Sequence, residues 1–147
     1  MHDVGKIGIP DKVLLKPGNL DGNEWEMMKK HCKIGAEIIG THSSPLLQMA
    51  HNIALTHHEK WDGSGYPHQL VGDEIPLEGR ITAIADVFDA LTSERPYKKA
   101  WSVEDATTMV DSNSGSHFDP SIVSLCHKVM PEILEIKDQY ADGTAQQ

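Results

Sequence analysis

The chain has 147 residues, a formal net charge of −9, nine histidines and two cysteines. An acidic chain is a poor candidate for non-specific DNA or RNA binding, because such binding neutralises many phosphates with Lys and Arg. Cys32 and Cys126 stand alone, no secretory signal is recognisable, and no apolar run reaches the ~20 residues of a membrane-spanning helix. We therefore expect a cytoplasmic domain with no membrane segment in this chain, large enough to fold without disulfides.

Apolar residues recur at helical spacing along the chain, between turns rich in Gly and Pro, which predicts an all-α bundle. We expect residues 1–140 to form one domain and residues 141–147 to form a polar tail. The first helix is predicted over residues 22–40. Asp21 stands three residues before Glu24, the spacing of a capping box at the start of this helix.

The first two predicted helices each carry an apolar stripe that turns histidine toward the core. In the first helix the stripe consists of Trp25, Met28, Cys32, Ala36 and Ile39. His31 lies on the edge of this stripe and is expected to point inward. A second helix is predicted over residues 45–58, with an apolar stripe made of Leu46, Ala50, Ile53 and Ala54. The same spacing directs His57 to the buried face, with His58 beside it.

Residues 59–79 contain too many Gly and Pro residues for a helix, so we predict a long ordered loop that forms part of a site. A helix over 79–92 follows, with Asp86 and Asp89 on one flank. Its inward residues are expected to be Ile81, Ile84, Ala85, Phe88 and Leu91. Two later helices are predicted by their first residues, one capped by Ser102 and ending near residue 112, the other starting at Asp119-Pro120. Pro131 is expected to kink or restart the last helix.

Inward histidines and aspartates favour a metal centre. The candidate ligands are His2, Asp3, His31, His57, His58 and Asp86. A single inward histidine is more often a hydrogen-bonded core residue, but burying all six polar groups without a metal would cost too much free energy. Mixed imidazole and carboxylate ligands suit Fe, Mn, Zn or Ni. Because neighbouring residues on a helix diverge by roughly 100°, we expect His57 and His58 to serve two ions, with Asp3 as a bridge.

Six segments then resemble, in order and at compatible spacing, the successive motifs of the HD-GYP family. They are His2-Asp3-Val4-Gly5-Lys6-Ile7-Gly8-Ile9-Pro10, His57-His58-Glu59, Asp62-Gly63-Ser64-Gly65-Tyr66-Pro67, Arg80-Ile81 with Ala85-Asp86-Val87-Phe88-Asp89-Ala90-Leu91-Thr92-Ser93, Arg95-Pro96-Tyr97-Lys98 and Gly115-Ser116-His117-Phe118-Asp119-Pro120. Each motif alone is weak, but the ordered set is specific. The resemblance covers roughly residues 2–135.

The resemblance implies an HD-domain-like helical bundle with a long ordered GYP loop, and a bacterial signalling phosphodiesterase that hydrolyses cyclic di-GMP to linear pGpG or GMP. It assigns the six candidate ligands to two or three divalent metal ions, with Fe or Mn expected and Zn or Ni as alternatives. By the same resemblance Asp3 and Lys6 are catalytic. From its place on the flank of Asp86, we expect Asp89 to orient a ligand or cation rather than to bind metal itself. Residues implied to bind substrate are Lys6, Tyr66, Pro67, Arg95 and Lys98.

The resemblance also leaves alternatives open. Family members carry further helices before the HD pair, so we expect this chain to be incomplete at its N-terminus, with impaired metal binding and an uncovered apolar face that favours a homodimer. A second hypothesis is a catalytically silent interaction module that binds diguanylate cyclase (GGDEF) domains through residues 62–67 of the GYP loop. A third keeps the enzyme but replaces the substrate by another cyclic dinucleotide.

Overall fold

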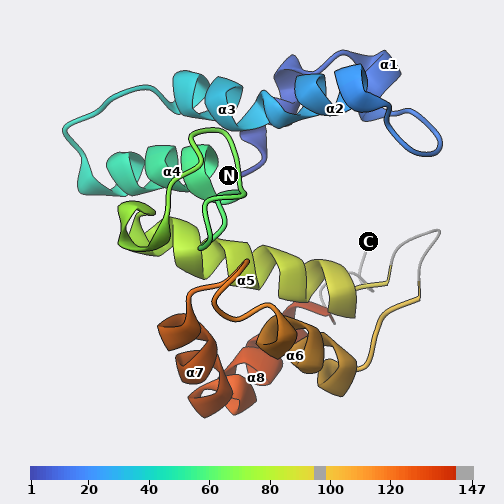
Figure 1. Cartoon of the computed structure of the whole chain (residues 1–147), viewed down its shortest axis with the longest axis vertical. Coiled ribbons are helices and arrows are strands. Elements are labelled where there is room, and N and C mark those ends of the chain that lie inside the picture. Colours follow the sequence, from blue (N-terminus) through green and yellow to red (C-terminus); the bar gives the residue numbers. More distant parts are fainter. Residues whose placement is uncertain (95–98, 142–147) are drawn as a thin grey trace.

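The computed structural model describes residues 1–94 and 99–141 and is helical, as the sequence predicts (Figure 1). Within these two ranges no β-strand forms, and extended pairing is limited to the isolated bridges Asp62–Val71 and Ser114–Phe118. No helix in the described part of the chain combines the length and the apolar character needed to cross a membrane.

The first half of the chain builds a layer of short helices. These are the 3₁₀ helix η1 (Val4–Gly8), α1 (Asp11–Leu14), α2 (Gly22–Lys29), α3 (His31–Ile39) and α4 (Pro45–Thr56). Helix α3 lies between η1 and α4 and contacts both. After α4 comes the GYP loop, which we define as residues 59–76 and which contains the 3₁₀ helix η2 (Gly72–Glu74).

The longest helix, α5 (Leu77–Thr92), runs across the middle of the molecule (Figure 1). Helices α3 and α4 lie on one side of it. On the other side lie α6 (Val103–Ser112), α7 (Pro120–Lys128) and α8 (Met130–Ala141). Since α5 contacts α4 as well as α6 and α7, it is the element shared by both halves of the fold.

Local capping signals predicted several helix starts. The Asp21–Glu24 capping box is present at α2, and the side chains of Ser102 and Asp119 cap α6 and α7. The restart expected near Pro131 also occurs, with α8 beginning at Met130. The single helix predicted over 22–40 is wrong, because regular hydrogen bonding is interrupted at Lys30, where α2 ends and α3 begins.

The predicted inward faces are only partly correct. Cys32, Ala36, Ala50, Ala54, Ile84, Phe88 and Leu91 are buried as expected. Trp25, Leu46 and Ile81 are instead 47%, 72% and 49% exposed, and Ala85 is exposed as well. Periodicity identifies an apolar stripe but not how much of it a neighbour covers, and here each helix meets its neighbours along only part of its stripe.

Two apolar clusters lie on the C-terminal side of α5, where it meets α6, α7 and the turn before α7. Ile84, Val110, Phe118, Ile122 and Val123 form one buried cluster. Phe88, Leu91 and Ala106 form a second cluster, against which residues of α8 pack. Between α5, α7 and α8 an apolar cavity of about 1120 Å³ remains. The C-terminal half therefore combines a packed apolar core with a loosely filled groove.

Candidate metal centre

The HD pair is positioned by a close contact between two backbones. A Cβ atom on Gly5 of η1 would lie 1.9 Å from the carbonyl oxygen of His31 and 2.4 Å from the backbone nitrogen of Gly35. Only glycine allows η1 to approach α3 this closely. The contact places Asp3, which directly precedes η1, against the His31 side chain.

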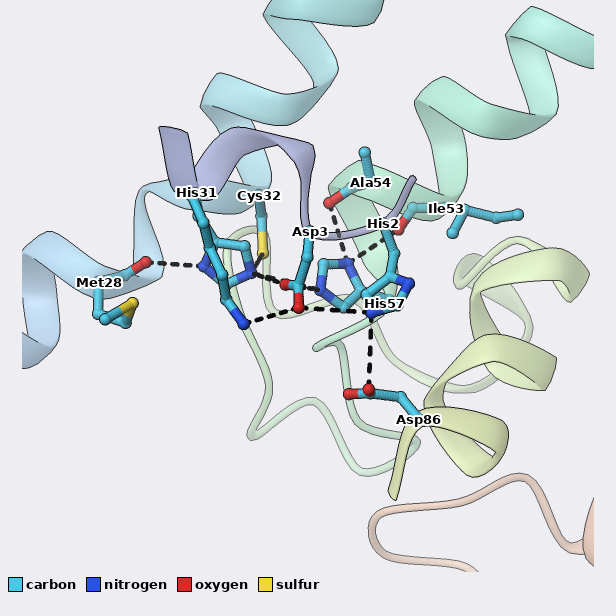
Figure 2. A network of polar contacts seen from close by, with 10 residues as sticks. His2, Asp3, Met28, His31, Cys32, Ile53, Ala54, His57 and Asp86 are labelled. Atoms are coloured by element: carbon cyan, nitrogen blue, oxygen red, sulfur yellow. Dashed lines mark hydrogen bonds and ion pairs between the residues drawn. The ribbon is translucent and has the colours of Figure 1, made fainter. Parts of the chain in front are cut away.

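Four of the six candidate ligands converge tightly. One ligand atom from each of Asp3, His31, His57 and His58 lies within 4.8 Å of all the others. Asp3 Oδ1 is 3.5 Å from His31 Nε2 and 3.8 Å from His57 Nε2 (Figure 2). His57 follows the last residue of α4 and keeps helical backbone angles, so the expectation that His57 and His58 serve two neighbouring ions stays a prediction.

Hydrogen bonds to the backbone determine which histidine nitrogens are free to bind a cation. The Nδ1 of His31 lies 2.7 Å from the carbonyl oxygen of Met28, and the Nδ1 of His57 lies 3.0 and 3.1 Å from those of Ile53 and Ala54. A carbonyl oxygen only accepts, so each Nδ1 carries the proton and donates. The Nε2 atoms of the neutral rings therefore present lone pairs to the centre of the cluster (Figure 2).

These lone pairs oppose one another. His31 Nε2 and His57 Nε2 are 3.3 Å apart, and both face Asp3 Oδ1, a buried oxygen that has no hydrogen-bond partner in the described part of the chain. Two bare nitrogens and a carboxylate oxygen in one buried space repel each other unless a cation lies between them. The donor set therefore fits a divalent transition metal ion.

The remaining two candidate ligands lie on the other side of Asp3. His2 Nε2 is 3.5 Å from Asp3 Oδ2 and 3.6 Å from Asp86 Oδ1 (Figure 2). The Asp3 carboxylate thus directs one oxygen to His31 and His57 and the other to His2 and Lys6, whose Nζ is 2.6 Å away. A carboxylate shared in this way suits the predicted bridge between two ions.

Burial and charge keep the site ready to bind a cation. Burial is the main cause that lowers the pKa of His57 and lowers the pKa of His58 to about 3, so both rings are neutral at neutral pH. Burial raises the pKa of the Asp3 carboxyl, but the hydrogen bond and positive charge of Lys6 outweigh it and lower that pKa overall. Cys32 is different, because burial raises its thiol pKa to about 12 and leaves the sulfur protonated beside His31.

The GYP loop is anchored by a carboxylate whose role the sequence did not indicate. Glu59 is only 2% exposed, and its two oxygens accept hydrogen bonds from the backbone N–H groups of His68 (2.7 Å) and Leu70 (3.1 Å). The sequence signal that could have indicated this role was the position of Glu59 directly after His57 and His58. By holding the loop, Glu59 places the Tyr66 ring in a stacked contact with His58, 4.9 Å between ring centroids.

A second anchor ties the same loop to the C-terminal half. One guanidinium nitrogen of Arg80 lies 2.8 Å from a carboxylate oxygen of Asp73 in the loop and 2.8 Å from one of Asp119 at the start of α7. The Arg80 guanidinium also lies over the Trp61 ring, 5.8 Å from its centroid. Arg80 appears in the motifs of the sequence, but this joining role became visible only in three dimensions.

The structure gives less detail on the roles of the other predicted site residues. Pro67 lies beside Tyr66 in the GYP loop and is partly buried. Asp89 is exposed and accepts a hydrogen bond from the Ser93 hydroxyl, so its action on a ligand or cation stays a prediction. Arg95 and Lys98 lie outside the described residues.

Comparison with known proteins gives consistent matches. A family model described as HD domain matches residues 1–122. The 3'3'-cGAMP-specific phosphodiesterase 2 of Vibrio cholerae is 50% identical over 142 residues, which cover 97% of this chain and 27% of the relative. A cyclic di-GMP phosphodiesterase of Thermotoga maritima is 50% identical over 136 residues, covering 92% of this chain and 37% of the relative. The chain thus spans between about a quarter and two fifths of the length of these relatives.

A solved structure supports the fold. The crystal structure of a cyclic GMP-AMP-specific phosphodiesterase of Vibrio cholerae matches with a TM-score of 0.60 and 23% identity, over 86% of this chain and 33% of that chain. At this identity the likeness concerns the fold alone. Together, these matches confirm the all-α fold and the family resemblance carried by the sequence motifs.

Proposed function

This chain belongs to the HD domain family, and we propose that it forms the catalytic domain of a metal-dependent phosphodiesterase acting on cyclic di-GMP. The products would be linear pGpG, GMP or both. The observation that carries the proposal is the buried meeting of the His31 and His57 lone pairs with an unpartnered Asp3 oxygen. Without a cation these lone pairs and the carboxylate oxygen repel one another, and with a cation they become its ligands. Relatives named as cyclic di-GMP phosphodiesterases support the choice of substrate.

The residues that would hold metal are His2, Asp3, His31, His57, His58 and Asp86, with Asp3 shared between two ions. Divalent ions bound there would supply Lewis acidity, which lowers the pKa of water and stabilises negative charge on phosphoryl oxygens. Fe or Mn is our first expectation, and Zn or Ni suits the same ligands.

Other side chains would act on the substrate itself. Lys6 holds its ammonium group 2.6 Å from Asp3, so it can keep that carboxylate ionised and meet a phosphate at the edge of the cluster. Tyr66 and Pro67 form the neighbouring wall. The roles of Arg95 and Lys98 as further phosphate contacts rest on the motif resemblance alone.

Metal analysis combined with a hydrolysis assay tests the proposal. The chain, purified with Mn²⁺ or Fe²⁺ supplied, should contain at least one equivalent of metal and convert cyclic di-GMP to pGpG or GMP. Asp3→Ala should lose the metal and at least about 100-fold of the activity, since even partners beyond the ligands typically change metal affinity 10–100-fold. Asp11→Ala, an exposed carboxylate on α1, is the matched control and should retain both.

The alternative function is an interaction module for GGDEF domains. It is favoured by the GYP loop, which Glu59 and Arg80 hold in place while Asp62, Ser64, His68 and Gln69 remain exposed. A chain that binds less than one equivalent of metal and hydrolyses no cyclic dinucleotide, yet binds a purified GGDEF domain, would replace the enzyme proposal by this one.

A further inference from the structure

An exposed tryptophan lies beside the metal cluster, where the proposed chemistry does not use it. Trp25 belongs to α2, a helix with no buried residue, and its own surface is 47% exposed. Its ring meets Tyr66 edge to face, with 6.3 Å between centroids. About half of this ring is therefore accessible to a stacking partner.

Two ring contacts connect this tryptophan to the candidate metal ligands. His58 stacks on Tyr66 at 4.9 Å, and Tyr66 in turn meets Trp25 at 6.3 Å. In a nucleotide the base lies one ribose away from the phosphate. A phosphate at the cluster would thus bring its purine into the reach of the exposed Trp25 ring, and indole is a good stacking surface for a base.

A lysine completes the same patch. Lys29 follows Trp25 by one helical turn, and its ammonium group pairs with the Glu26 carboxylate at 2.5 Å while lying 5.8 Å from the centroid of the Tyr66 ring, so its other N–H donors remain for a ligand. An ammonium group donates hydrogen bonds and accepts none. It can therefore bind guanine, which presents the acceptors O6 and N7 on one edge, whereas adenine presents an amino donor in place of O6.

From these contacts we propose that Trp25, Tyr66 and Lys29 form a base subsite, in which one purine of the substrate stacks on Trp25 and Lys29 selects guanine over adenine. This inference rests on the proposed cyclic-dinucleotide phosphodiesterase activity. It adds to that activity a binding site for the base and a preference between the two purines.

The stacking arm compares three substitutions at one position. Trp25→Ala should raise KM for cyclic di-GMP about 10-fold while leaving metal content and the inhibition constant of inorganic phosphate within about 2-fold. Trp25→Phe keeps an aromatic face and should stay within about 3-fold of the parent. Trp25→Leu keeps apolar bulk without a ring and should resemble Trp25→Ala. Tyr140→Ala, an exposed aromatic on α8, is the control and should have no effect.

Three results would overturn base stacking. The first is an unchanged KM in Trp25→Ala, and the second is a Trp25→Leu variant as good as Trp25→Phe, which would mean packing. The third is a Trp25→Ala variant that loses bound metal and phosphate inhibition together with its rise in KM, which would mean that the substitution disrupts the metal site and not a base contact. If the parent chain hydrolyses nothing, the proposed function fails, and calorimetric binding of cyclic di-GMP decides the inference. Binding that Trp25→Ala weakens supports the subsite, whereas binding that it leaves equal, or no binding by the parent, overturns it.

The selection arm uses Lys29→Gln. KM for cyclic di-GMP should rise about 5-fold, while KM for cyclic di-AMP changes less than about 2-fold. Lys33→Gln, an exposed lysine on α3, is the matched control for the loss of one positive charge. An equal rise for both nucleotides would show charge attraction alone and remove Lys29 from base selection.

Discussion

The two regions on either side of α5 are buried in different ways. The N-terminal region encloses polar groups, among them His31, His57 and Glu59, each at most 2% exposed. The C-terminal region encloses apolar clusters around Phe118 and Phe88. Apolar burial stabilises a fold without any ligand. The N-terminal region also buries apolar residues such as Ile9, Val13 and Ile75, but its converging lone pairs oppose folding until a cation binds between them.

The largest expected effect is loss of apolar packing in the C-terminal region. Phe118 is 1% exposed, and Phe118→Ala should lower the free energy of unfolding by about 3–5 kcal/mol, through lost burial and the cavity that remains. Chemical denaturation measures it. Leu125→Ala, at a residue 55% exposed, should change stability by no more than about 0.5 kcal/mol. Equal effects at both positions would contradict the assignment of the core.

Metal addition should produce the next largest effect, and only through the N-terminal region. At a free Mn²⁺ concentration 100 times the dissociation constant, the folded chain should gain about 2.7 kcal/mol, visible as a higher Tm. Asp3→Ala should abolish this gain, because its carboxylate is shared by both groups of ligands. Phe118→Ala should retain it. A metal-induced gain that survives Asp3→Ala would place the cation elsewhere.

The GYP loop offers a smaller effect within the polar region. Glu59→Gln replaces one accepting oxygen by an amide NH₂ group. This donor then faces the backbone N–H of His68 or Leu70. Leaving that donor unpaired should cost about 1–3 kcal/mol and accelerate amide hydrogen exchange at the two residues. Glu37→Gln, at an exposed position on α3, should change neither. Unchanged exchange in Glu59→Gln would show that the loop is held by other contacts.

The smallest effect is a pH dependence at the junction of the two regions. Burial raises the pKa of Asp119, but hydrogen bonds from Ser121 and Arg80 outweigh it and lower that pKa overall. A lowered pKa in the folded state stabilises the fold above the unfolded value of about 4, and this contribution disappears as the pH falls through the folded pKa. Asp119→Asn should therefore destabilise at neutral pH and converge with the parent in acid. A constant difference between the two would contradict this.

The sequence correctly predicted features that depend on residues close together in the chain. Capping residues such as Asp21, Ser102 and Asp119 act within their own helix turn, so the helix starts could be predicted from neighbouring residues alone. All six candidate metal ligands also come together, within the cluster or around the shared Asp3.

Features that depend on contacts between distant segments could not be predicted. Trp25 has the spacing of a core residue, yet it lies half exposed with its ring against Tyr66 of the GYP loop. Glu59 resembles any glutamate until the backbone of residues 68–70 folds over it. Each case required the three-dimensional path of a loop.

The crossing of Gly5 over Gly35 has a consequence for how sequence variation in this domain should be read. Neither residue offers a functional group, yet any added side chain at Gly5 would meet the backbone of α3 and displace the adjacent Asp3. In a saturation survey of variants, Gly5 should therefore cluster with the metal ligands in its intolerance of change. Gly5 would thus be grouped with the functional residues although it has no functional group, because its role is to leave room for the close backbone contact that positions Asp3.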